Sequence, residues 1–201
     1  MQAQSATTST EGEYYLQGVM ETASGFKLNP DHTFNFFFSY GALDREGEGV
    51  WKQEGDAIVF NSFQKARQDF ILIRSNKQQD HGITIQITDA NAMLKKMVHA
   101  SVRSGNTTAQ SAANEEGIIT FKTATADSIT LLFEWCPEKK FVFNVPDTTH
   151  NYFEFRFAPS IIEVLFNNFR LQLTESGLKG PHPLDDSKTF YFKKAAQHQG
   201  E

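Results

Sequence analysis

The chain of 201 residues has a single cysteine, Cys136, and therefore forms no disulfide within itself. Its cysteine content leaves the redox compartment open. No stretch of about 18 apolar residues occurs, so no membrane-spanning helix is expected. The formal net charge is -5, and the sequence has neither a run of five or more like charges nor a basic stripe. A general nucleic-acid binder needs a basic patch, so we do not expect nucleic acid as a partner.

The sequence also lacks the local spacings of metal sites and cofactor sites. None of its six histidines forms His-x-His or His-x-x-x-His, and none stands beside the cysteine. Metal sites bring three or four ligands together, usually with such spacing, so no metal ion and no other cofactor is predicted. The pairs Asp31-His32 and Asp80-His81 are interpreted as turns, where aspartate is favoured by its local hydrogen bonds. His150 and His182 fall at loop ends and are expected to be solvated.

Motifs of nucleophilic catalysis are missing as well. There is no Gly-x-Ser-x-Gly elbow and no glycine-rich phosphate loop. Cys136 follows Trp135 at the end of an apolar strand, which favours a buried, inert thiol. No catalytic residue is therefore predicted, and the chain is expected not to be an enzyme. Two carboxylates can converge from any distance, so an uncharacterised hydrolase stays as the last-ranked hypothesis.

The N-terminal residues 1–11 are small and polar, and we expect a disordered tail there. The chain shows no basic and apolar leader of the signal-peptide kind. The composition of these residues resembles the start of a mature exported protein to which a start Met has been added. This favours a periplasmic or exported protein, and an ordinary cytoplasmic tail is the alternative.

What the sequence does have is phenylalanine: 19 Phe against 2 Trp and 5 Tyr. Phe34, Phe36 and Phe38 alternate with Asn35 and other polar residues, which is the pattern of a half-buried β-strand. Each buried aromatic side chain removes roughly 150–250 Å² from water. We therefore predict a β-rich fold with a core made mainly of phenylalanine.

The same alternation recurs along the chain and divides it into three parts. A β-meander is predicted for residues 12–76, and the polar stretch Ser75–His81 is the best internal boundary. A second group of strands is predicted for 82–147, with a mobile loop at Ser104–Glu116. Further strands are predicted for 150–195, and these either complete the first sheet or extend the second group. Helical turns fit only at Leu94–Met97 and Ser160–Leu165.

Two partial family resemblances follow from these segments. Residues 12–62, with Leu28-Asn29-Pro30-Asp31-His32-Thr33-Phe34 and a later Gly49-Val50-Trp51, resemble the repeated hairpins of lipocalin-like (calycin) small β-barrels. Residues 83–145, with Ile85-Gln86-Ile87-Thr88-Asp89, Ala100-Ser101-Val102 and Glu116-Gly117-Ile118-Ile119-Thr120-Phe121, resemble transthyretin-like domains of the carboxypeptidase regulatory type. The second resemblance implies an accessory domain that serves folding, docking or adhesion. Neither resemblance brings a functional residue with it.

The predicted fold is therefore all-β: an antiparallel lipocalin-like meander or barrel combined with a transthyretin-like β-sandwich. If the strands of 150–195 return to the first sheet, the sandwich is an insertion.

For function, the first hypothesis is a non-enzymatic binding or accessory module of a bacterial cell envelope that recognises an unknown protein partner. The alternative is a calycin-like carrier, in which opposing phenylalanines line a cavity for a small apolar ligand. The candidate binding residues are aromatic: Phe37, which lies off the main alternation, Phe63 between Ser62 and Gln64, and Tyr40 and Trp51.

Overall fold

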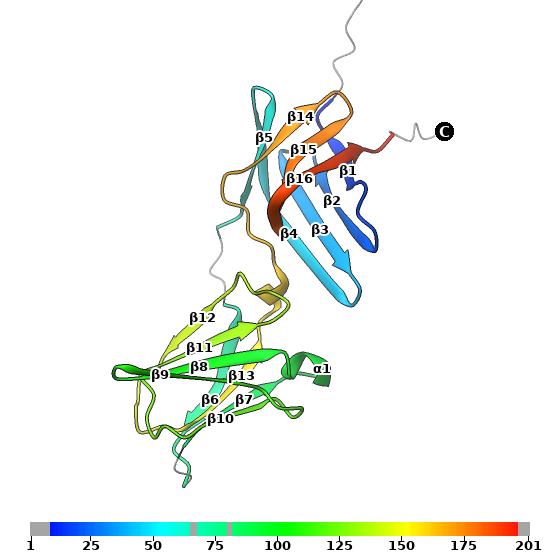
Figure 1. Cartoon of the computed structure of the whole chain (residues 1–201). Coiled ribbons are helices and arrows are strands. Elements are labelled where there is room, and N and C mark those ends of the chain that lie inside the picture. Colours follow the sequence, from blue (N-terminus) through cyan, green and yellow to red (C-terminus); the bar gives the residue numbers. More distant parts are fainter. Residues whose placement is uncertain (1–8, 65–67, 80–81, 197–201) are drawn as a thin grey trace, which may run out of the picture. The chain divides into compact units, whose positions relative to one another are not determined.

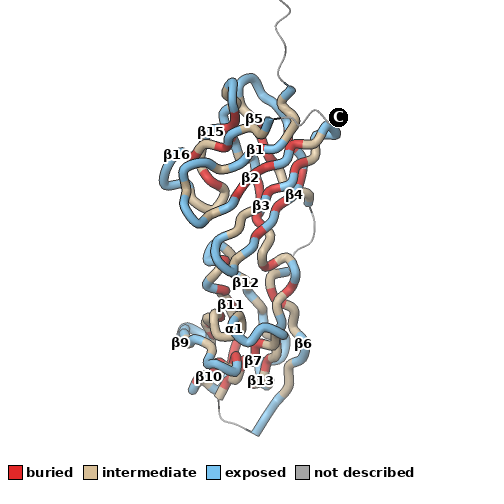
Figure 2. The backbone as a smooth tube through the Cα atoms, turned by 90° about the vertical axis from the view of Figure 1, so that its right-hand side faces the viewer, coloured by how far each residue is buried: buried red, intermediate tan, exposed pale blue. Residues whose placement is uncertain are grey.

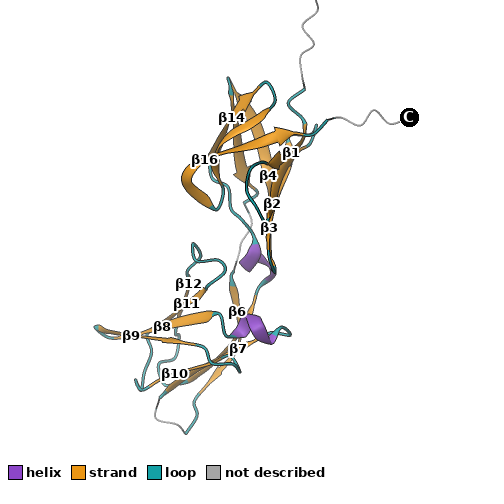
Figure 3. Cartoon of the chain, turned by 45° about the vertical axis from the view of Figure 1, so that its right-hand side comes forward, coloured by secondary structure: helices purple, strands orange, loops and turns teal. Residues whose placement is uncertain are grey.

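The computed structural model describes residues 9–64, 68–79 and 82–196, and it divides into two compact units (Figure 1). The barrel unit combines the described residues up to 64 with those from Ile162 onward. The sandwich unit, residues 68–161, is inserted between these two segments. The prediction of an all-β protein is confirmed. Figure 3 shows two short helical segments in the described chain, α1 (Ala92–Lys95) and the 3-10 turn Pro159–Ile162.

Eight antiparallel strands close the barrel in the order β1-β16-β15-β14-β5-β4-β3-β2. Their bounds are β1 Gly12–Leu16, β2 Thr22–Leu28, β3 Thr33–Tyr40, β4 Leu43–Glu54, β5 Ala57–Ser62, β14 Phe169–Thr174, β15 Gly177–His182 and β16 Asp185–Lys194. The predicted returning strands thus supply β14 to β16. Because β1 pairs with β16, the sheet has no free edge.

Alternation of the side chains fills the interior of the barrel with aromatic rings. Phe34 and Phe36 of β3 point inward with Phe26 of β2. Buried positions alternate with exposed ones from Phe34 to Phe37 (Figure 2). The ring of Phe26 lies 5.0 Å from that of Phe36 and 4.7 Å from that of Phe60, measured between centroids. Such tilted and edge-on contacts add to the free energy gained from burial.

Phe166, from the connection that precedes β14, also enters the interior. Its ring lies 5.0 Å from that of Phe34 and 5.4 Å from that of Phe36. Gly47 of β4 leaves room for this ring, because a Cβ at that position would lie only 2.6 Å from Cε2 of Phe166. A larger residue at position 47 would therefore collide with the Phe166 ring.

Backbone hydrogen bonds hold the segment that carries Phe166 against β4 and β5. The N–H of Val164 donates to the carbonyl of Glu46 at 2.7 Å, and the N–H of Ser62 donates to the carbonyl of Phe166 at 2.8 Å. The buried Arg45 side chain donates from Nε to the carbonyl of Ile162 at 3.2 Å. The segment thus continues the barrel wall where β4 extends beyond β5.

The sandwich unit consists of two four-stranded sheets. One has the order β10-β7-β13-β6 and includes a parallel pair, β7 with β13. The other has the order β12-β11-β8-β9 and is antiparallel. The bounds are β6 Phe70–Asn76, β7 Ile83–Thr88, β8 Val98–Ser104, β9 Thr107–Ala112, β10 Ile118–Phe121, β11 Ser128–Phe133, β12 Phe141–Asn144 and β13 Tyr152–Phe157.

The two sheets of the sandwich pack face to face through apolar side chains. The ring of Phe143 on β12 lies 5.5 Å from that of Phe155 on β13, and the ring of Phe141 lies 5.7 Å from that of Phe70 on β6. Ile83, Ile85 and Ile87 of β7 are fully buried, as their clean alternation predicts. The outer face of each sheet therefore carries the remaining, alternate side chains.

Three segments are placed differently from the sequence-based division. Residues 70–76, assigned to the first meander, and 152–157, assigned to the returning strands, pair with each other in the sandwich unit. The predicted mobile loop at Ser104–Glu116 contains a strand, β9, that forms a hairpin with β8. Period-two alternation tells which face of a strand is buried, but it does not identify the strand's partner. No helix in the described ranges is long and apolar enough to cross a membrane.

Candidate functional site

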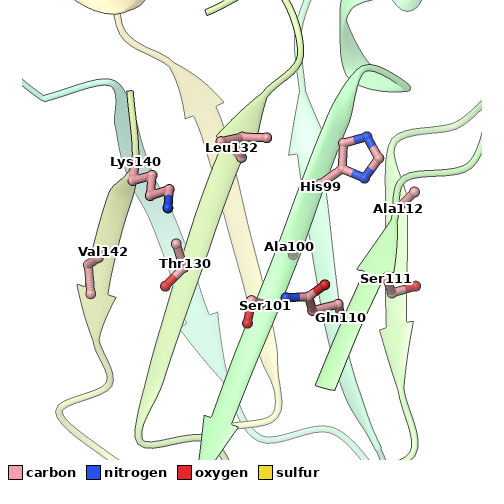
Figure 4. A pocket seen from close by; sticks show the side chains of 10 residues that line it. All are labelled: His99, Ala100, Ser101, Gln110, Ser111, Ala112, Thr130, Leu132, Lys140 and Val142. Carbon is pink, nitrogen blue, oxygen red and sulfur yellow. The ribbon is translucent and has the colours of Figure 1, made fainter. Parts of the chain in front are cut away.

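A groove lies on the outer face of the β12-β11-β8-β9 sheet (Figure 4). Cross-strand register places its side chains in two rows. One row contains Ala112, His99 and Leu132, and the other contains Gln110, Ser101, Thr130 and Val142. Lys140, just before β12, closes one end. These residues share one face because each is separated from the next on its strand by two positions.

Short side chains in the second row produce the hollow. Ser101 and Thr130 lie opposite each other at the centre of the face, with the longer Gln110 on one side and Val142 on the other (Figure 4). The groove has a volume of about 760 Å³, within the range of small-molecule and peptide sites. Val142 is 56% exposed, so an apolar side chain faces solvent along one side of the groove.

A histidine and a glutamate are in contact at the His99 end of the groove. Nε2 of His99 lies 2.5 Å from Oε1 of Glu134, and both side chains are nearly half exposed. No hydrogen bond joins His99 to Ser101 in the described chain, although both residues lie on the same face of β8. A serine nucleophile is activated through a hydrogen bond to its base, and the structure does not show that bond between these two residues.

Phe37, one of the predicted binding residues, points outward from the barrel and is 39% exposed. Its ring lies over Gly25 on the neighbouring strand, where a Cβ would lie 2.9 Å from its Cε1. Tyr15 follows next in the same cross-strand row, with its ring centroid 6.1 Å from that of Phe37. Phe37 is thus half covered by the strand beside it and by a second aromatic ring.

The other side of Phe37 borders a second hollow of about 350 Å³ on the barrel wall. Glu46, Glu48 and Glu163 line this hollow together with Phe37. Tyr40 lies at the end of β3 and is exposed, and Phe63 is half-buried just after β5. The structure does not bring Tyr40 or Phe63 into this hollow.

Trp51, the fourth predicted binding residue, belongs to the core and not to the surface. It is only 5% exposed, and its Nε1–H donates to the carbonyl of Asn29 at 3.1 Å. Its ring lies 4.8 Å from that of His32. The alternation of β4 explains this placement, because Trp51 shares its face with Gly47 and Gly49, which point into the barrel.

The prediction that His182 is solvated is wrong. The residue ends β15 inside the barrel, is 4% exposed, and is surrounded by phenylalanine rings whose centroids lie 5.5 to 6.1 Å away: Phe36, Phe38, Phe190 and Phe192. Its Nε2 lies 3.0 Å from Oγ of Ser24, which is also buried. A serine and a histidine in contact inside a pocket of aromatic rings require comparison with a catalytic dyad.

The direction of the hydrogen bonds excludes a catalytic role for this pair. Nδ1 of His182 accepts the backbone N–H of Leu184 at 3.1 Å, so in neutral imidazole the proton is on Nε2. Nε2–H therefore donates to Ser24, whose hydroxyl donates in turn to the carbonyl of Phe37 at 2.9 Å. A general base must accept the proton of the serine instead, so Ser24 is not activated.

Burial lowers the pKa of His182 to about 4, and the nearby carboxylate of Asp185 opposes this shift only in part. The imidazole is therefore neutral near pH 7, as its two hydrogen bonds require. The pair is a polar element of the barrel core in which every hydrogen-bonding group has a partner.

Other candidate residues have structural roles. Asp31 accepts hydrogen bonds from the backbone N–H and the hydroxyl of Thr33, which lower the pKa of its carboxyl group. This is the turn that the sequence predicts at Asp31-His32, whereas Asp80-His81 lies outside the described residues.

Cys136 is fully buried. Nδ1 of His150 lies 2.9 Å from the hydroxyl of Ser75. The described residues contain no group of His, Cys, Asp and Glu side chains that could hold a metal ion.

Comparison of the chain with known protein families, with curated proteins and with solved structures finds no match.

Proposed function

We propose that the protein is a non-enzymatic recognition module whose sandwich unit binds a segment of a partner polypeptide in the groove of the β12-β11-β8-β9 sheet. The observation that carries this proposal is the groove itself, with its volume of about 760 Å³ on an outer sheet face. Protein binding is the function that its lining supports best.

The chemistry of the lining suits a polypeptide main chain. The hydroxyls of Ser101 and Thr130 and the amide of Gln110 can each donate and accept a hydrogen bond. Peptide groups present both kinds of partner. Leu132 and Val142 add apolar contacts at the side of the groove, and such a mixture of apolar surface and a few oriented polar groups is typical of binding sites.

The carrier hypothesis receives less support from the geometry. The interior of the barrel is occupied by its own side chains, among them Phe26, Phe60 and the inserted Phe166. A calycin-like carrier would need that volume for its ligand. The hydrolase hypothesis is also less favoured, because the Ser24–His182 pair has the wrong hydrogen-bond polarity and the structure shows no hydrogen bond between Ser101 and His99.

Location in a bacterial cell envelope is part of the same proposal. The resemblance of residues 83–145 to accessory transthyretin-like domains supports this location. Fractionation of the producing cells tests it: recovery of the protein in the cytoplasm would contradict the proposed location without affecting the groove.

Photo-crosslinking in the producing cells tests the groove. A benzophenone amino acid at Thr130 or Val142 is expected to capture one discrete polypeptide. The matched control position is Thr120, which is exposed on the opposite sheet and should capture none. Filling the groove with Ser101→Trp should abolish the adduct formed from Val142, whereas Thr120→Trp should not.

The negative outcomes of this experiment are equally specific. No polypeptide adduct from either groove position, or the same adducts from Thr120, would contradict the proposal. Catalytic turnover by the purified protein would contradict its non-enzymatic part. Circular dichroism of each variant establishes that a lost adduct reflects the groove and not a lost fold.

A further inference from the structure

β9 is an edge strand of the sandwich unit and is hydrogen-bonded to another strand on one side only. It pairs with β8 through a two-residue turn, and the φ of Gly105 in that turn is 57°, the left-handed region that such turns use. In the sheet order β12-β11-β8-β9 no strand follows it. Its second row of backbone groups therefore faces away from the sheet.

The register identifies which residues carry the outward groups. Ala113 donates its N–H to the carbonyl of Val98, so odd-numbered residues of this segment bond to β8. Thr108, Gln110 and Ala112 alternate with them and turn their N–H and C=O groups outward. Within the described residues, no hydrogen bond to these three outward pairs is found.

β9 also lacks the features that normally protect an edge from other strands. Such edges carry charges, prolines or bulges, or are very short. β9 has the sequence TTAQSA, with no charge and no proline, and every residue except Ser111 is exposed. Among the strands that the structure describes in the sandwich, it is the only edge strand with six uncharged residues in continuous register.

The other edge strands of the sandwich have features that hinder pairing with a strand of another chain. β6 contains Arg74 and an irregularity in its pairing with β13. β12 and β10 are four residues long. Charged residues flank both of these strands: Lys140 precedes β12, and Lys122 follows β10.

We propose that β9 pairs antiparallel with β9 of a second copy of this chain, which joins two four-stranded sheets into one of eight strands. The outward residues 108, 110 and 112 are symmetric about Gln110. A two-fold axis at Gln110 therefore places Gln110 opposite its own copy, and Thr108 opposite Ala112 of the copy. All three pairs are then of the hydrogen-bonded kind, so every outward N–H and C=O finds a partner.

The uncharged sequence is what makes a second copy the fitting occupant. Self-pairing of a charged strand would place like charges opposite each other, which is unfavourable, and β9 avoids this at every position. A contact through six-residue strands is smaller than the standard interface of roughly 1,200–2,000 Å². The dimer should therefore dissociate on dilution, and light scattering should show its fraction rising with protein concentration.

Disulfide trapping tests the register directly. In the proposed dimer the two Gln110 Cα atoms are about 5.5 Å apart, within the range of about 4.4–6.8 Å that a disulfide needs. Gln110→Cys should therefore form a covalent dimer under mild oxidation. Thr108→Cys alone should not, because its two copies would lie about 13 Å apart along the strands. A mixture of Thr108→Cys with Ala112→Cys should give the mixed dimer.

Two further measurements make the outcome decisive. Gln110→Pro removes only an outward N–H and should raise the dissociation constant of the dimer at least tenfold, while Gln110→Ala should change it less than threefold. A folded Gln110→Cys protein that stays monomeric on oxidation, together with a wild-type protein that is monomeric at every concentration, would overturn the proposal. The native Cys136 does not interfere, because it is fully buried.

Discussion

The two units of this chain manage the edges of their sheets in opposite ways. The barrel unit pairs β1 with β16 and leaves no edge, and its aromatic side chains fill the inside. The sandwich unit keeps two separate sheets with an edge at each side, and its outer face is hollowed by short side chains. The barrel is therefore a closed sheet around a packed aromatic core, and both surfaces that we propose for binding lie on the open sheets of the sandwich.

The largest expected effect on the difference between the two units comes from removing the Phe166 ring from the interior of the barrel. Phe166→Ala should lower the free energy of unfolding of the barrel by about 3–5 kcal/mol, because a buried ring with several aromatic neighbours leaves a cavity. The sandwich unit should be unchanged. The two tryptophans report the units separately in denaturant titrations, since Trp51 lies in the barrel and Trp135 in the sandwich.

Single-tryptophan variants give the control for this measurement. Trp135→Phe leaves the barrel reporter, and Trp51→Phe leaves the sandwich reporter. Equal shifts of both transitions on Phe166→Ala would contradict independent units and would mean that the whole chain unfolds as one cooperative body.

An intermediate effect comes from acid and should also be confined to the barrel. The pKa of His182 is about 4 in the folded protein, compared with about 6.5 in an unfolded chain. Below pH 6.5 the unfolded state binds a proton that the folded state does not, so barrel stability falls as the pH falls, until about pH 4. At pH 4.5 the loss should be on the order of 2–3 kcal/mol relative to pH 7.

The matched variant for this effect is His182→Asn, which is uncharged at every pH. Its barrel transition, followed by Trp51 fluorescence, should lose most of the pH dependence between 6.5 and 4.5, although its stability at pH 7 is lower. A wild-type transition with no pH dependence in this window would refute the assignment of a buried neutral imidazole.

The smallest expected effect concerns the stability of the sandwich unit and comes from one of its salt bridges. Lys139 binds the carboxylate of Asp69 at 3.2 Å and the carbonyl of Ser160, with its side chain 10% exposed. Lys139→Met should cost about 1 kcal/mol in the transition reported by Trp135, because a partly buried carboxylate loses its partner. Arg74→Met removes a comparable pair with Glu154 that is largely exposed on the Arg74 side, and should cost less than about 0.5 kcal/mol. Equal costs would show that burial does not strengthen the Lys139 pair.

Residue patterns predict the faces of the strands well and their partners poorly. The alternation of Phe34, Phe36 and Phe38 identifies β3 and its inward face from sequence alone. The same kind of alternation in Phe153 and Phe155 identifies β13, yet nothing local reveals that this strand lies between β6 and β7. That arrangement depends on pairing between segments that are far apart in the sequence, and a local periodic pattern does not reveal such pairing.

The candidate site could not be predicted from the sequence, for a related reason. The aromatic residues that the sequence offers as candidates include Phe37, which is exposed, but also Trp51, which is buried. The groove arises instead from short side chains, Ser101 and Thr130, that become neighbours only through the register of β8 and β11. β9 was interpreted as a loop because its small polar residues lack apolar alternation, although Gly105 marks the turn before it.

The insertion of the sandwich unit has a consequence for the order of events on the ribosome. Strands β1 to β5 emerge first, but β14 to β16, which close the barrel, follow only after the whole sandwich has been made. At ordinary rates of about 5–20 residues per second, roughly one hundred intervening residues take about 5–20 s. Throughout that interval Phe26, Phe34, Phe36 and Phe60 belong to an unfinished sheet with its aromatic face uncovered. The nascent chain is therefore most prone to aggregation while its central unit is being synthesised, and a chaperone would act on the protein at that stage.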